Sequence, residues 1–321
     1  MGETGGRGIP GVKPPGVIVN GRARRARRDR SLGERLGRLL PEEYLHFTES
    51  LEDLDRALAR LRDLGVEQLV LVGGDGTVGG TLTPLLRIWD GTPLPAVTLT
   101  PGGTVNTIAH SLEARLSPEA TLRRLLDGGR PALDVTRPLV WVEPEDAPPR
   151  AGLIFVNGVA ARWLELYYEG DELGPRPAAA LVARIARSAL TGTRLARELF
   201  EARRVAIVVD GEHLEVERFT VMGAASVRDI GLGFRPFRSA GTDPEHIHFL
   251  YTDAGALRVS LELPAQRLGL LNLGTCLEHY SATSVELRFA APEPWSVDAD
   301  LYSPTLALRI SAGPAVRFLS Y

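Results

Sequence analysis

The chain has 321 residues, of which 44% are hydrophobic and 24% are charged, and its formal net charge is −3. This composition is typical of a globular protein with enough apolar residues for one large core or two ordinary ones. The near-neutral charge does not indicate a nucleic-acid partner, and no apolar run approaches the length that a membrane-spanning helix needs.

Cysteine and lysine are both nearly absent. Cys276 is the only cysteine, which excludes an intrachain disulfide and a cysteine-built metal site and favours a cytoplasmic protein. Lys13 is the only lysine, so 36 of the 37 basic residues are arginines. P-loop enzymes and protein kinases contact phosphates through a lysine in the catalytic domain, and Lys13 does not lie in such a motif. Those two designs are therefore excluded.

The N-terminal part of the chain alternates between strand and helix signals. Residues 1–14 are rich in glycine and proline, lack the apolar core of a signal peptide and are expected to be a flexible lead-in. Leucines spaced three or four apart then predict an amphipathic helix over 49–65: Leu51, Leu54, Leu58, Leu61 and Leu64. Further helices are predicted over 78–89 and 117–129, and buried strands over 16–20, 66–74 and 94–100. This alternation predicts a doubly wound α/β domain over residues 15–133.

The pattern changes after residue 134. Short strand-like runs follow one another at 152–159, 203–211, 218–226, 246–252, 257–263, 284–290 and 305–311. One long helix, expected at 177–200, interrupts them. These features predict a second, mostly antiparallel β domain over residues 134–302, and the segment 303–321 could return to the first domain.

The sequence GGDGT at 73–77 lies between a predicted buried strand and a predicted helix. Gly73, Gly74 and Gly76 would let backbone amides approach a phosphate, and the helix start adds partial positive charge. Asp75 would repel a bare anion, so it suggests either a bound cation such as Mg²⁺ or a proton acceptor. A plain turn is the alternative interpretation, although a turn requires one glycine rather than three.

A second glycine cluster, TPGGTVNTIAH at 100–110, follows the next predicted strand. In a doubly wound sheet, ligands bind beyond the carboxyl ends of the strands, so both clusters are expected at one crevice. Thr104 and Asn106 could bond phosphate or adenine there. Capping of the following helix is the alternative role.

GGDGT followed about thirty residues later by PGGTVN resembles the diacylglycerol kinase-like lipid kinases, a family that includes bacterial lipid kinases and sphingosine kinases. The resemblance extends along the chain through VIVN at 17–20, IFVNGVAA at 154–161 and VDADLYSP at 297–304. NAD kinases and phosphofructokinases carry loops similar to GGDGT, so the order of the motifs is what distinguishes the families.

The resemblance implies an ATP-binding α/β domain and a β-rich, lipid-facing domain with the active site between them. It implies an ATP- and Mg²⁺-dependent kinase that phosphorylates a hydroxyl of a diacylglycerol-like or other amphiphilic lipid. Asp298 and Asp75 would be catalytic, Asp298 as general base, and Asp75 and Asp300 would hold metal. The nucleotide-contacting residues would be Asn20, Gly73, Gly74, Asp75, Gly76, Thr77, Gly103, Thr104 and Asn106. For Asp298 alone, a solvated turn is the alternative interpretation.

The chain departs from this family at several positions. Gly79 and Gly80 replace an asparagine–glutamate pair, and Thr107 replaces an aspartate. Asp298–Asp300 reads Asp-Ala-Asp rather than Asp-Gly-Glu, and Asp243–Glu245 replaces the Asp-Gly-Leu of a structural metal site. These departures leave two alternatives open: an NAD kinase-like phosphotransferase, or a nucleotide- or lipid-binding protein with impaired catalysis on the same fold.

Two basic features complete the sequence. The run GRARRARRDR at 21–30 could bind nucleotide phosphates or anionic lipid, or be a solvated loop. The predicted helix at 177–200 carries arginines beside apolar residues, so it either contacts a membrane peripherally, at the inner face, or packs on the sheet. A homodimer is also consistent with the sequence.

Overall fold

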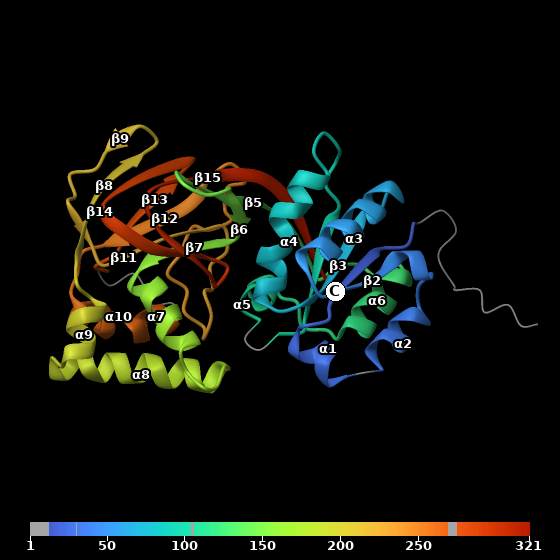
Figure 1. Ribbon diagram of the computed structural model, residues 1–321, viewed down its shortest axis with the longest axis horizontal. Coiled ribbons are helices and arrows are strands. Elements are labelled where there is room, and N and C mark those ends of the chain that lie inside the picture. The colour runs from blue at the N-terminus through green and yellow to red at the C-terminus, as the bar shows by residue number, and fades with distance from the viewer. Residues whose placement is uncertain (1–12, 30, 104–105, 269–274) are drawn as a thin grey trace, which may run out of the picture. The chain divides into compact units, whose positions relative to one another are not determined.

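The computed structural model describes residues 13–29, 31–103, 106–268 and 275–321 (Figure 1). The chain divides into two compact units, one ending at Arg137 but including Val316–Tyr321, the other spanning Pro138–Ala315. The boundaries fall within strands β5 (Leu133–Pro144) and β15 (Asp300–Ser320). The segment 303–321 therefore contributes its last six residues to the first unit.

The first unit contains a parallel sheet in the order β2, β1, β3, β4 and the end of β15. Its strands are β1 (Gly16–Asn20), β2 (Leu45–Thr48), β3 (Gln68–Gly73) and β4 (Ala96–Pro101). β1 lies between β2 and β3, with Val17 opposite Leu45 on one side and Val70 on the other. The predicted fold class, a doubly wound α/β domain followed by an antiparallel β domain, is confirmed.

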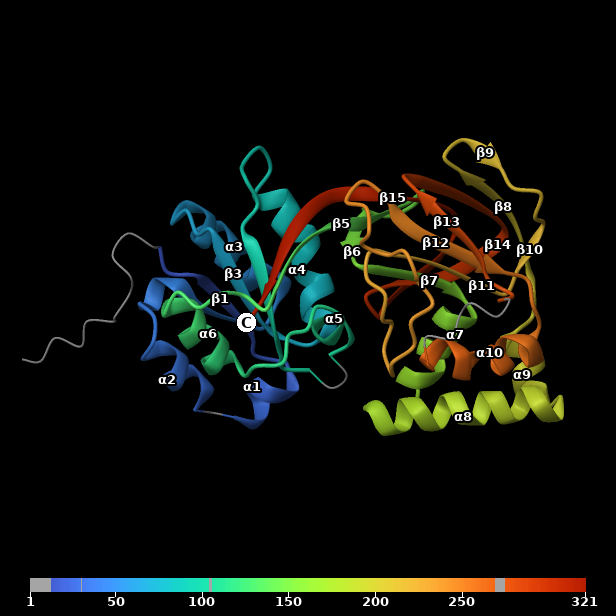
Figure 2. The same ribbon diagram turned by 180° about the vertical axis from the view of Figure 1, so that it is seen from behind.

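Helices cover both faces of this sheet (Figures 1 and 2). α2 (Leu32–Gly37) and α6 (Pro118–Leu126) pack against the side chains of Val17, Val19, Val70 and Val72. Neighbouring strand residues point to the opposite face, where α3 (Leu51–Asp63) and α4 (Asp75–Ile88) pack together. The remaining short elements are α1 (Arg24–Arg28), the 3₁₀ turn η1 (Glu42–Tyr44) and α5 (Thr107–Ser111).

Helix α3 shows how local sequence sets these boundaries. Ser50 caps its start by accepting a hydrogen bond from the Asp53 amide at 3.0 Å, and the Asp53 carboxylate accepts one from the Ser50 amide at 3.1 Å. This reciprocal pair begins the helix, and Gly65, with φ +66°, follows its end. Of the predicted leucine stripe, Leu51 is 70% exposed because it lies in the first turn, before the helix reaches the sheet.

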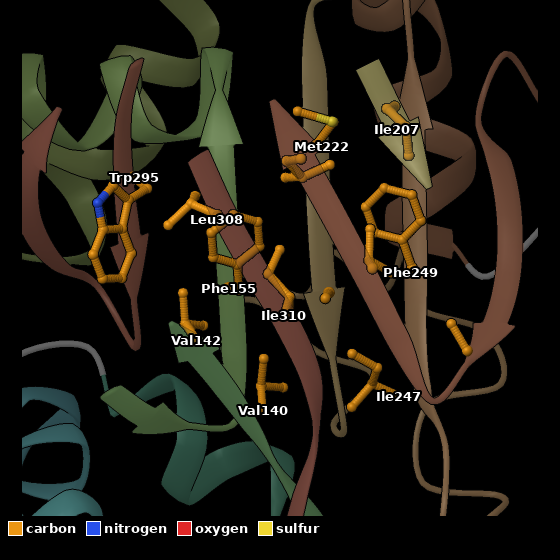
Figure 3. Close-up of a cluster of buried hydrophobic side chains, with 14 of the residues drawn as sticks. Val140, Val142, Phe155, Ile207, Met222, Ile247, Phe249, Trp295, Leu308 and Ile310 are labelled. Carbon is orange, nitrogen blue, oxygen red and sulfur yellow. The ribbon is translucent and has the colours of Figure 1, made fainter. Parts of the chain in front are cut away.

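The second unit is built mainly of antiparallel strands, with β13, β12, β11, β7 and β14 in that order and β14 also pairing with β15 and β8. The strands are β6 (Arg150–Gly152), β7 (Ile154–Gly158), β8 (Arg203–Val209), β9 (Glu212–His213), β10 (Arg218–Phe219), β11 (Val221–Ala225), β12 (Ile247–Thr252), β13 (Glu278–Ala282) and β14 (Ser284–Val297). Their inward side chains form one apolar core. Figure 3 labels ten of its members, which come from β5, β7, β8, β11, β12, β14 and β15.

The second unit is more helical than the sequence pattern predicts. Residues 257–263, which alternate apolar and polar side chains like a strand, belong to helix α10 (Ala256–Leu268). The strand prediction is wrong there because α10 packs along another helix, α8 (Pro175–Thr191), rather than pairing with a sheet. The predicted helix at 177–200 is two helices, α8 and α9 (Arg194–Leu199), separated at Gly192, whose φ is +64°. α7 (Val159–Tyr168) follows β7 directly.

Candidate active site

The two glycine clusters of the first unit pack backbone against backbone at the carboxyl ends of β3 and β4. The Gly102 amide donates to the Gly73 carbonyl at 2.8 Å. A Cβ placed on Gly74 would lie 2.8 Å from the Gly103 Cα, and one placed on Gly103 would collide with the Gly74 Cα. Most of these glycines are therefore required by the close approach of the two loops. A single turn would not require them.

The end of β1 is joined to the start of α4. The Asn20 amide group donates from Nδ2 to the Thr77 hydroxyl at 2.8 Å, while its Oδ1 accepts from the Arg22 amide at 2.9 Å. Gly73 lies against the Thr77 side chain, because a Cβ on Gly73 would overlap that side chain. The Thr77 oxygen accepts a hydrogen bond from Asn20, so its own O–H remains able to donate.

Asp75 connects the two loops through its side chain. Its Oδ2 accepts from the Thr107 amide and its Oδ1 from the Ile108 amide, both at 2.9 Å. These are the first amides of α5, so the carboxylate caps that helix. Burial raises the pKa of Asp75, and the two amide bonds offset that effect only in part. Asp75 thus has a structural role beside the metal-binding and catalytic roles predicted for it.

Asn106 closes the second loop on itself. It has a left-handed backbone, with φ 57°, and its Oδ1 accepts from the Gly103 amide at 2.7 Å while Nδ2 donates to the Gly103 carbonyl at 3.3 Å. It therefore shapes the loop instead of capping α5 through its side chain. Thr104, the other predicted contact in this loop, lies outside the described residues.

The start of α4 presents backbone amides that have no acceptor among the residues that the structure describes. Gly74 precedes the helix without a side-chain cap, and its carbonyl accepts from the Thr77 and Val78 amides at 2.9 and 3.2 Å. Within the described parts of the chain, the amides of Asp75 and Gly76 make no hydrogen bond, and Gly76 is exposed. Free amides and the positive end of a 14-residue helix favour an anion.

Arginines of the run at 21–30 lie beside these loops. The Arg25 amide donates to the Gly102 carbonyl at 3.1 Å, and its guanidinium donates to the Pro101 carbonyl at 3.4 Å. Arg22, Arg27 and Arg28 are exposed. The sequence predicted Arg25 only as one member of this run, which directly follows a strand that ends at this edge of the sheet, and did not distinguish it from the other arginines. The run therefore contacts the second glycine loop through Arg25.

Asp298, the predicted general base, lies in the second unit in the turn between β14 and β15. It is 3% exposed, and its carboxylate accepts from the amides of Leu153 and Ile154 at 2.9 Å. The backbone is left-handed at both Asp298 and Ala299, with φ 50° and 72°. Asp298 therefore has a structural role in this turn, whatever its part in catalysis.

Asp300, predicted to bind metal, is the first residue of β15, directly after this turn, and is half-buried. Burial, and then the charge of Asp300, raises the pKa of Tyr302 to about 12. At Asp243, the carboxylate accepts from the Glu245 amide at 2.8 Å and lies 2.8 Å from His246. Among the described residues, no group of three His, Cys, Asp or Glu side chains is arranged to hold a metal ion.

The predicted site residues therefore fall into two groups. Those on the glycine loops and at the end of β1 meet in the first unit, whereas Asp298 and Asp300 belong to the second unit. Gly80, at the position of the family's glutamate, faces open space, since a Cβ there would meet nothing within 4 Å. No helix in the described part of the chain has the length and apolar character needed to cross a bilayer.

Comparison with known proteins identifies the first unit. Residues 14–137 match the model of the diacylglycerol kinase catalytic domain. This part of the chain is similar to a diacylglycerol kinase catalytic domain. The resemblance predicted from GGDGT and PGGTVN is confirmed there.

Relatives and solved structures agree with this assignment. Two proteins named "Probable lipid kinase YegS", from Salmonella arizonae and Salmonella heidelberg, are 35% identical over 94 residues, which are 29% of this chain and 31% of theirs. The match thus spans about a third of these relatives. The solved structure titled "A putative diacylglycerol kinase from Bacillus anthracis str. Sterne" has a TM-score of 0.69 at 14% identity and covers 98% of this chain and 99% of its own. A second structure from that organism, titled as a diacylglycerol kinase, has a TM-score of 0.61 at 14% identity and 98% coverage of both chains. At this identity the structures show a shared two-domain fold.

Proposed function

We propose that the protein is an ATP- and Mg²⁺-dependent lipid kinase that transfers the γ-phosphate of ATP to a hydroxyl of a diacylglycerol-like or other amphiphilic lipid. One observation carries the proposal. The segment that matches the catalytic domain also contains two interlocked glycine loops and a helix start with free amides. The acceptor class is taken from the lipid kinases that the chain resembles.

The residues at the loops fit a nucleotide phosphate. The amides of Asp75 and Gly76 and the Thr77 hydroxyl supply donors, and Arg22, Arg27 and Arg28 supply charge nearby. Mg²⁺ is usually held by one or two carboxylates together with substrate phosphates and water, so a preformed cage is not needed. Asp75 is the carboxylate positioned for this, and bound Mg²⁺ would neutralise charge on the phosphates.

In the proposed reaction the lipid hydroxyl oxygen attacks the γ-phosphorus, the bond from that phosphorus to the ADP oxygen breaks, and the hydroxyl proton passes to a carboxylate. We assign that proton to Asp298. Hydrogen bonds from the Leu153 and Ile154 amides hold both of its oxygens in place. A loose phosphoryl-transfer transition state requires positioning more than a strong base.

A catalytically impaired binding protein is the second candidate, and it rests on Gly79 and Gly80. A Cβ placed on Gly80, where the family has a glutamate, would meet no atom within 4 Å. Gly80→Glu is therefore an informative variant, because it restores a carboxylate at a position that accepts a Cβ without a clash. If the parent is impaired for this reason, the variant should turn over faster than the parent, whereas Gly80→Gln should not.

The test measures ADP release with three acceptors: dispersed diacylglycerol, NAD and water alone. Turnover with diacylglycerol that requires Mg²⁺ and is absent with NAD supports the proposal. Turnover with NAD in place of the lipid would establish the NAD kinase-like alternative. Calorimetric titration of ATP, with and without Mg²⁺, covers the remaining case: binding without turnover on any hydroxyl acceptor identifies a binding protein.

A further inference from the structure

We propose that the outer face of α8, together with exposed leucines of the adjoining α10, docks the protein on an anionic membrane surface. The proposal deepens the proposed function, on which it rests for its purpose, because it names the surface through which a lipid kinase would reach its substrate. Its evidence is the distribution of charge and apolar surface on the helices of the second unit.

The inner face of α8 is already occupied. The helix buries Ala178, Leu181, Ile185, Ser188 and Ala189. These pack with Tyr167 of α7 and Leu199 of α9. In both views α8 is the outermost of the helices α7, α8, α9 and α10 of the second unit (Figures 1 and 2). Its other face is therefore available to a partner.

That outer face is positive and lacks acidic residues. Arg176, Arg184 and Arg187 are exposed, and between Glu172 and Glu198 the chain contains no aspartate or glutamate. No ion pair joins these three arginines to any side chain in the described ranges. Unpaired arginines on one face favour a negatively charged partner surface.

Most of the exposed large apolar side chains lie on or beside the helices of this unit. Nine large hydrophobic residues are exposed in the described part of the chain, and six of them lie between α7 and α10: Tyr168, Leu173, Leu190, Leu257, Leu261 and Leu268. Leu190 and Leu261 are each 63% exposed, and Leu268 is 70% exposed. α10 packs along α8, so these leucines and the arginines belong to neighbouring helices.

Arginines beside exposed leucines suit a bilayer better than an acidic protein. Leucines can enter the boundary between headgroups and acyl chains while the long arginine stems lie along it and their guanidinium groups contact lipid phosphates. Each arginine near an anionic surface contributes roughly fivefold in affinity. The three arginines of α8 together should therefore contribute about a hundredfold.

Sedimentation with vesicles tests this surface. The probes are vesicles of phosphatidylcholine alone and of phosphatidylcholine mixed with phosphatidylglycerol. We expect the parent protein to sediment with the mixed vesicles and to dissociate from them as the salt concentration is raised. The variant Arg176→Gln/Arg184→Gln/Arg187→Gln should bind them about a hundredfold more weakly. Leu190→Gln/Leu261→Gln should also bind more weakly, with the salt dependence retained.

The matched control is Arg204→Gln/Arg288→Gln/Arg309→Gln, which removes the same charge from exposed strand positions of the same unit. It should bind like the parent. An equal loss of vesicle affinity in both triple variants would show that only net charge matters and would overturn the proposal. Failure of the parent protein to bind anionic vesicles would also overturn it. A concentration-dependent dimer that Leu190→Gln/Leu261→Gln dissociates would instead show that a second copy covers this face.

A soluble acceptor separates this proposal from the proposed function. With a short-chain diacylglycerol below its aggregation limit, the α8 variants should turn over like the parent, whereas with vesicle-borne diacylglycerol they should be slower. If the parent phosphorylates neither acceptor, the kinase proposal fails, and vesicle sedimentation still decides the docking proposal.

Discussion

Asp75 offers the sharpest test of how the glycine loops are held. Its carboxylate accepts the Thr107 and Ile108 amides at 2.9 Å each and so links the start of α4 to the start of α5. Asp75→Ala removes both acceptors. A buried amide left without a partner costs about 1–3 kcal/mol. Ile108 is buried and Thr107 half-buried. We therefore expect a local loss of about 3 kcal/mol, roughly 2 from Ile108 and 1 from Thr107.

Asp75→Asn should cost much less. Its single carbonyl oxygen still accepts one amide, and the neutral side chain avoids the burial penalty of the charge, so a loss within about 1 kcal/mol is expected. Because burial raises the folded-state pKa of Asp75, the folded chain holds a proton that the unfolded chain has already released. The stability of the parent relative to Asp75→Asn should therefore fall as pH rises above about 4, the ordinary aspartate range.

Hydrogen exchange read by mass spectrometry is the appropriate assay, because a chain of two units need not unfold in one step. In Asp75→Ala the amides of Thr107–Ser111 should exchange on the order of a hundredfold faster than in the parent. In Asp75→Asn they should exchange less than about tenfold faster. Unchanged exchange in Asp75→Ala, together with lost ATP binding, would refute the capping role and leave Asp75 as a ligand-binding residue alone.

Three further changes test other parts of the structure. Gly103→Ala should lower the free energy of unfolding in urea by about 2 kcal/mol or more, because its Cβ would collide with the Gly74 backbone. Gly80→Ala should raise it by about 0.5–1 kcal/mol, because its Cβ meets no atom and the residue lies inside α4. Equal effects of the two variants would contradict the close packing of the two loops. Asp298→Asn should lower the free energy of unfolding by about 1–2 kcal/mol, because it weakens the hydrogen bonds from the Leu153 and Ile154 amides. If kcat falls only as far as the smaller fraction of folded protein explains, Asp298 is not the base. Burial lowers the pKa of His248 to about 4, so between about pH 6.5 and 4 the unfolded chain binds a proton that the folded chain does not. The free energy of unfolding should therefore decrease as the pH is lowered from about 6.5 to 4, and it should decrease less in His248→Gln. Parallel pH profiles for the parent and the variant would count against this role of His248.

Several parts of the fold and the site follow from local sequence. The leucine spacing and the Ser50–Asp53 cap specify α3, and the apolar runs specify the parallel strands, because periodicity and capping act over a few residues. The motif order GGDGT then PGGTVN was enough to predict the similarity to a diacylglycerol kinase catalytic domain. The position of both motifs after strands also predicted that they would meet, since parallel strands end at one edge.

Other features were decided by contacts between distant residues. Residues 257–263 alternate like a strand but form a helix because α8 lies beside them. The sequence places Asp75 among glycines that are predicted to bind phosphate, yet its carboxylate accepts hydrogen bonds from amides more than thirty residues away.

By itself, then, the sequence determined the succession of elements in the first unit, the fold class and the family that the first unit resembles, all of which depend on short-range patterns. Only the tertiary structure decided that the glycines serve loop-to-loop packing, that Asp298 is fixed by the amides of Leu153 and Ile154, and that arginines and leucines share the helical layer of the second unit. The physical reason is that a side chain's partners are set by which segments fold against each other, and local periodicity carries no information about that choice.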